Sequence, residues 1–138
     1  MGKVANWERM LCEFLESCAS KEFAWGEWDC MHFARDAERA IYGDSTMDGL
    51  DETHKYHDLR SMLRLLMEHD CVDVFEFVSK HKQEVNVNFM QRGDWAGVIA
   101  NTGHTIGVWD GRHIWVPSQT GLAAMPFQSA MIAWRVRG

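Results

Sequence analysis

The chain has 138 residues, of which 46% are hydrophobic and 25% are charged. This composition is that of one soluble globular domain over residues 1–138, and it excludes a disordered chain. The formal net charge of −6 excludes the basic surface of a nucleic-acid-binding module. No apolar run is long enough to cross a membrane, and the polar N-terminus has no secretory segment. The four cysteines are therefore expected to be reduced thiols in a cytoplasm.

The first half of the chain has the residue spacing of helices. Apolar residues recur every three to four positions after Asn6, a residue type that caps helices. Gly43 is suited to end a helix, because glycine adopts the left-handed backbone found there. Four helices are expected: one that begins after Asn6 and includes Trp7 to Leu15, one from near Cys30 to Gly43, one over Asp58–His69, and a short one over Val72–Lys80.

The third predicted helix carries large apolar residues on one side. These are Leu59, Met62, Leu63, Leu66 and Met67. Their spacing is typical of a helix face that packs into the core. It does not suggest a cofactor site, and we expect no cofactor.

After Asn88 the sequence changes to short β-branched and aromatic segments separated by turn residues. Asp110-Gly111 lies between two apolar runs and predicts a hairpin. Helices that precede an antiparallel sheet indicate the α+β class, with the sheet covered by the helix that carries Cys30. The predicted strands are Asp94–Ala100, Thr105–Asp110, Arg112–Pro117, Gly121–Met125 and Ile132–Val136.

An aromatic, glycine-containing loop delivers Cys30 to the start of the second helix. The unpaired N–H groups and the positive dipole end of a helix start favour a thiolate, which is the nucleophilic form of cysteine. The alternative is that Cys30 is a buried, inert residue beneath the helix start, as free cysteines usually are. The sequence leaves both interpretations open.

Four short motifs follow one another in a familiar order: Phe23-Ala24-Trp25-Gly26, Asp29-Cys30, Arg92-Gly93-Asp94, and His104 shortly before Gly107. In this order the chain resembles the NlpC-type cysteine peptidases of the papain-like fold. It looks more closely like small phage and prophage proteins that carry this fold in degenerate form. The resemblance implies one NlpC-like domain with Cys30 as nucleophile and His104 as base.

The chain also departs from the family pattern. Two residues, Thr105 and Ile106, separate His104 from Gly107, where the peptidases have one. Because side chains alternate across a strand, this step places His104 on the opposite face unless a bulge near Gly103 restores it. The third polar residue of the family would fall near Val116 or Pro117, which cannot orient a base.

Several other residues are candidates for the site. His113 is the reserve base, although it also fits a solvated strand end. Asp29 is expected to cap the helix. Trp25, Trp28 and Trp95 are expected to line an aromatic binding cleft.

A second constellation holds nitrogen and sulfur ligands of the kind that zinc takes: His54, His57, His69 and Cys71. The surrounding charges are typical of a solvated surface, and no metal site is predicted.

Two functions remain open. In one, a cysteine amidohydrolase cuts a peptide or peptidoglycan-like substrate, with Cys30 attacking and His104 transferring the proton. In the other, an inactive relative binds a phage structural protein during virion or tail assembly. We expect the protein in the cytoplasm of a bacterial host or associated with the virion.

Overall fold

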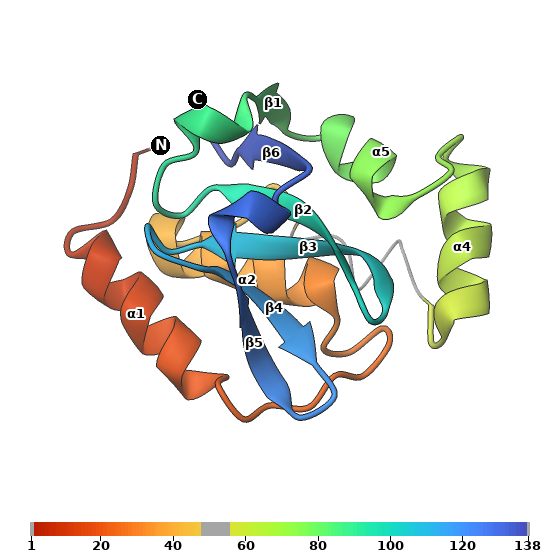
Figure 1. Ribbon diagram of the computed structural model, residues 1–138, viewed down its shortest axis with the longest axis horizontal. Helices are drawn as coiled ribbons and strands as arrows, with labels where there is room; N and C mark the ends of the chain where they lie inside the picture. Colours follow the sequence, from red (N-terminus) through yellow and green to blue (C-terminus); the bar gives the residue numbers. More distant parts are fainter. Residues whose placement is uncertain (1, 48–55, 138) are drawn as a thin grey trace.

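Six strands form one antiparallel sheet, in the order β1-β6-β2-β3-β4-β5 (Figure 1). The structure is a computed structural model that describes residues 2–47 and 56–137. The helices are α1 (Trp7–Ser17), α2 (Cys30–Tyr42), α4 (Leu59–Glu68) and α5 (Val74–Ser79). The strands are β1 (Gln83–Val85), β2 (Trp95–Ala100), β3 (Gly103–Trp109), β4 (Ile114–Ser118), β5 (Gly121–Met125) and β6 (Ile132–Arg135). The α+β class expected from the sequence is confirmed.

The sheet separates two apolar layers of unequal size. On one face, Trp95, Ile106 and Val108 join a large core with residues of the helices. Helix α2 contacts β3 and β4 and lies behind them in Figure 1. On the other face, the smaller core contains Ala96, Val98, Ile114 and Val116. The position of a residue in β2, β3 or β4 therefore determines which of the two cores its side chain faces.

Helix α2 has well-defined ends. The Asp29 side chain caps it by accepting the backbone N–H of His32 at 3.1 Å. Gly43 ends it in the left-handed region with φ of 88°, and its N–H donates to the Arg39 carbonyl. Both predictions made for this helix are confirmed, because short-range capping chemistry decides them.

Two expectations about the other helices are wrong. Asn6 lies in the left-handed region with φ of 58°, and its side chain makes no capping hydrogen bond. In α4 only Leu66 is buried, while Leu59, Leu63 and Met67 are exposed. The core position expected for the stripe is confirmed for Leu66 and for Met62, which packs against the core, and is wrong for Leu59, Leu63 and Met67, which belong to the surface.

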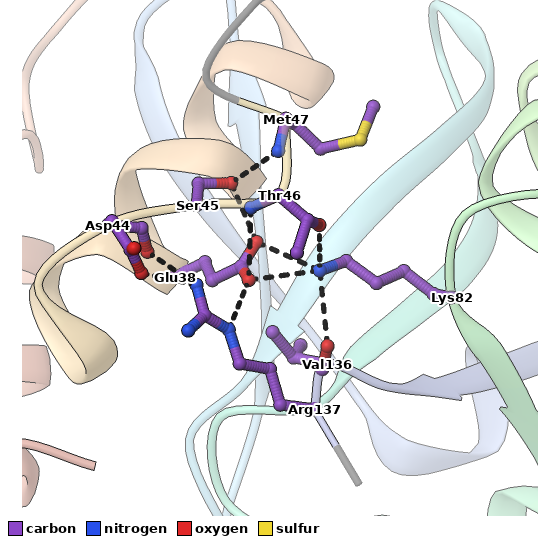
Figure 2. A network of polar contacts seen from close by, with 8 residues as sticks. All are labelled: Glu38, Asp44, Ser45, Thr46, Met47, Lys82, Val136 and Arg137. Carbon is purple, nitrogen blue, oxygen red and sulfur yellow. Dashed lines mark hydrogen bonds and ion pairs between the residues drawn. The ribbon is translucent and has the colours of Figure 1, made fainter. Parts of the chain in front are cut away.

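A buried ionic network, shown in Figure 2, connects Val136 and Arg137 to α2. Glu38 is fully buried and accepts two hydrogen bonds of 3.0 Å from Lys82 Nζ. Arg137 Nε donates to the same carboxylate at 2.9 Å, and Ser45 Oγ donates at 2.7 Å. Lys82 Nζ also donates to the Val136 carbonyl at 3.1 Å. One carboxylate thus joins segments that are far apart in the sequence.

Candidate functional site

Cys30 is the first residue of α2, as expected, but its thiol is not activated. Desolvation of the half-buried Cys30 and, to a smaller extent, the charge of the neighbouring Asp29 raise the pKa of its thiol from 9.0 to about 12. The backbone N–H groups of Ile106, Cys30 and Met31 act in the opposite direction without reversing the shift. The thiol is therefore neutral at pH 7, because desolvation and a nearby carboxylate outweigh the helix start.

His104 lies on the same face of the sheet as Cys30's helix. The β2–β3 pairing runs without a bulge from Trp95↔Val108 to Ala100↔Gly103. His104 therefore shares its face with Ile106 and Val108, and it is Thr105 that points to the other side. Of the two alternatives left open for His104, the opposite face is wrong, and the helix side is reached without the expected bulge, because α2 packs on the face of the even-numbered β3 residues.

The His104 ring is nevertheless engaged away from the sulfur. Its Nε2 atom lies 3.6 Å from Asp73 Oδ2, and its ring packs edge-on against Phe75 at 4.7 Å between centroids. The side chain is 48% exposed. Among the described residues, no hydrogen bond joins His104 to Cys30.

Both residues nevertheless line the same small cavity. Its volume is about 20 Å³, which is room for about one water molecule. A peptide cannot enter without rearrangement of the walls. The remaining lining residues are Phe23, Trp25, Asp29, Met31, Tyr56, Met62, Val74, Thr102 and Thr105.

Asp29 organises the loop that leads to Cys30. Its carboxylate accepts hydrogen bonds from His32 Nδ1 at 2.8 Å and from the Gly26 N–H at 2.9 Å. Burial alone would raise the pKa of Asp29, but the hydrogen bond and charge of His32, with hydrogen bonds from Tyr56 and Gly26, hold it below its usual value. Asp29 is thus an ionised structural cap, and the His32 ring bonds to it.

The tryptophans do not form the expected open cleft. Trp28 is 3% exposed and Trp95 is fully buried, so both belong to the core. Within the part of the chain that the structure describes, neither indole N–H has a hydrogen-bond partner. Trp25 alone lines the cavity, with its ring perpendicular to that of Phe23 at 4.8 Å.

The other predicted base lies at the far end of β3. His113 follows the Asp110-Gly111 hairpin turn, beside the pair Trp109↔Ile114, and its backbone N–H donates to Asp110 Oδ1. It is exposed to solvent, whereas the cavity adjoins the Gly103 end of the strand. His113 therefore cannot replace His104 as a base for Cys30.

The carboxylate beside His104 was missed from the sequence. Asp73 caps α5 by accepting the Glu76 N–H at 3.0 Å, and its other oxygen faces His104. The expected third position is apolar, since Val116 and Pro117 are buried in β4. In the sequence Asp73 fits a structural helix cap, and its proximity to the His104 imidazole arises only in the folded chain.

Comparison with models of protein families assigns the chain to a family. The model of a family described as a domain of unknown function, DUF6950, matches residues 2–136. The chain belongs to this family. No curated protein matches it.

The DUF6950 domain also carries a larger groove on its sheet. The groove has a volume of about 770 Å³, within the range of ligand sites. It lies between the β2–β3 turn and the β4–β5 hairpin, and none of its lining residues is charged. Thr102 lines both this groove and the Cys30 cavity. The groove residues are Ile99, Ala100, Asn101, Thr102, Val116, Pro117, Ser118, Gln119, Thr120, Ala123 and Met125.

The residues considered for zinc are only partly described in the DUF6950 structure. His54 lies outside the described residues. His57 is exposed beside Asp58, with 3.6 Å between Nε2 and Oδ2. Over residues 2–47 and 56–137, no group of three histidine, cysteine or acidic residues could hold a metal ion. Within the same residues, no helix has the length and apolarity to cross a bilayer.

Proposed function

We propose that this DUF6950 protein is a non-catalytic relative of the NlpC-type, papain-like domains and acts as a binding module in virion or tail assembly. The observation that carries the proposal is the state of Cys30. A cysteine hydrolase needs a thiolate with an imidazole within hydrogen-bond reach. Cys30 instead has a pKa raised to about 12 by burial, beside a cavity of about 20 Å³.

The resemblance to the NlpC-type domains is supported by the placement of the motifs. The cysteine begins the helix that packs on the central strands, and the histidine lies near the start of β3 on the helix side. An antiparallel sheet follows the helices in the chain. For a domain that keeps this arrangement with a protonated cysteine, we infer that its role is recognition of a partner.

A second candidate is a cysteine amidohydrolase that acts on cell-wall peptides. It is favoured by one observation: Cys30 and His104 line the same cavity, and Asp73 lies 3.6 Å from His104 Nε2. In that case the Cys30 proton passes to His104 as sulfur attacks the carbonyl carbon, and the leaving amine takes that proton. Water then hydrolyses the thioester. This route requires the cavity to open and the His104 ring to turn toward sulfur.

The two candidates differ in the reactivity of Cys30. We would measure iodoacetamide alkylation of each cysteine against pH by peptide mapping, with the exposed Cys12 as an internal reference. For the binding module, Cys30 reacts more slowly than Cys12 at neutral pH, and His104→Ala changes nothing. A Cys30 thiolate that forms below about 8.5 and is lost in His104→Ala would overturn the proposal in favour of the hydrolase.

Activity provides a second readout. The protein is incubated with muropeptides, and the products are analysed by mass spectrometry beside a Cys30→Ser variant. No cleavage by either protein is the expected result. Cleavage by the natural chain alone would establish the hydrolase.

A further inference from the structure

Helix α4 carries an apolar surface with no covering in the described structure. Leu59, Leu63 and Met67 are 44%, 42% and 73% exposed. They are spaced four residues apart, so they form one stripe along about two turns. The helix stands at the edge of the molecule in Figure 1. Isolated exposed apolar residues are ordinary, but an aligned stripe on a peripheral helix marks an interaction surface.

Two arginines flank this stripe. Arg60 and Arg64 line the same shallow depression as the three apolar residues, with a volume of about 710 Å³. Neither guanidinium forms an ion pair or hydrogen bond within the described residues. Both are exposed, on a chain whose net charge is −6. The surface therefore combines apolar contacts with two exposed cations, of which Arg60 also lies near enough to Asp58 to contribute to the lowered pKa of that carboxyl.

We propose that the α4 surface, defined as Leu59, Arg60, Leu63, Arg64 and Met67, binds an acidic amphipathic helix of a partner protein. Apolar residues four apart pack against a similar stripe on another helix, while glutamates or aspartates beside that stripe pair with the two arginines. The inference rests on the proposed binding role and names its partner class.

Charge also argues against a membrane as the occupant. Helices that lie on anionic membranes are rich in lysine and arginine, and attraction to the lipid headgroups contributes to binding. Here two arginines stand on a chain with a net charge of −6, so the molecule as a whole is repelled by such a surface. A short acidic helix contacts α4 alone, next to the two arginines, and the negative charges elsewhere on the chain act on it from a greater, screened distance.

The test uses two synthetic 18-residue helical peptides. Each has leucines spaced three and four apart, flanked by glutamates in one peptide and by lysines in its twin. Binding to the full chain is measured by fluorescence anisotropy. We expect the glutamate peptide to bind at least about tenfold more tightly than the lysine peptide, which corresponds to about 1.4 kcal/mol.

Matched variants locate the binding. Arg64→Glu should weaken binding of the glutamate peptide about tenfold or more, whereas Arg112→Glu, the same charge change on the exposed β3–β4 turn, should leave the affinity within about twofold of wild type. Leu63→Ser should weaken it as well, whereas Met131→Ser, at another exposed apolar residue, should not.

Three results would overturn the assignment: equal binding of the two peptides, a dimer that Leu63→Ser dissociates in sedimentation, or binding to phosphatidylserine vesicles in preference to the glutamate peptide. Each rejects the acidic partner while the alkylation result at Cys30 stands, so the two proposals fail separately.

Discussion

Replacing Lys82 by methionine should destabilise the fold strongly, because it leaves a buried carboxylate without its main cation. Glu38 has no exposed surface and accepts two 3.0 Å hydrogen bonds from Lys82 Nζ. Removal of one partner of a buried ion pair costs about 3–5 kcal/mol. Because Arg137 still donates to Glu38 at 2.9 Å, we expect a loss near the lower end, about 3 kcal/mol.

Urea unfolding monitored by tryptophan fluorescence measures this loss as a change in the free energy of unfolding. Arg112→Met, which removes an exposed cation, is the control and should change that energy by less than about 0.5 kcal/mol. Adding Glu38→Gln to Lys82→Met should recover about 1 kcal/mol or more, because the uncompensated charge is removed. A loss below about 1 kcal/mol in Lys82→Met, with an unchanged urea dependence, would show that Glu38 does not depend on this cation.

Three further predictions concern the loop before α2 and the first residue of that helix. The pKa of Asp29 is depressed in the folded chain, so its ionised carboxylate stabilises the fold above the ordinary pKa of 3.8, and this stabilisation is lost as pH falls through the pKa of the folded chain. Asp29→Asn should therefore reduce the difference between the urea midpoints at pH 7 and pH 3. The pKa of Cys30 is raised from 9.0 to about 12, so the fold loses stability as pH rises through that interval, where the unfolded chain ionises this thiol and the folded chain does not. Cys30→Ala should therefore flatten the fall in melting temperature above pH 9. Gly26 has φ of 79°, and a Cβ there would collide with the Tyr56 carbonyl. Gly26→Ala should therefore destabilise more than Gly103→Ala, since Gly103 has φ of 96° with open space around it; equal losses in urea unfolding would argue against the collision.

The elements that were predicted correctly are those decided by neighbours in the sequence. The bounds of α2 follow from an aspartate cap and a terminal glycine, and the hairpin follows from Asp110-Gly111. Strand β1 was missed because Gln83–Val85 has no strand pattern of its own and is held by pairing with β6. Local chemistry is visible in the sequence, whereas pairing to a distant strand is not.

The site was less predictable than the fold. The position of Cys30 at a helix start was correct, but the state of its thiol depends on burial and on the Asp29 charge, which periodicity does not reveal. The proximity of Asp73 to His104 depends on how α5 packs against β3. In the same way, the pattern of α4 predicted a face packed into the core, but Leu59, Leu63 and Met67 are exposed, because periodicity does not show whether another layer covers a face.

The ionic network around Glu38 has a consequence for synthesis of the protein. Arg137 follows Glu38 by 99 residues, which a ribosome adds in roughly 5 to 20 s. During that interval the Glu38 carboxylate lacks both Arg137 and the Val136 carbonyl that helps to hold Lys82. The Glu38 carboxylate therefore stays hydrated in a nascent chain until Val136 and Arg137 are available, so final packing of this side of α2 is a late event in folding.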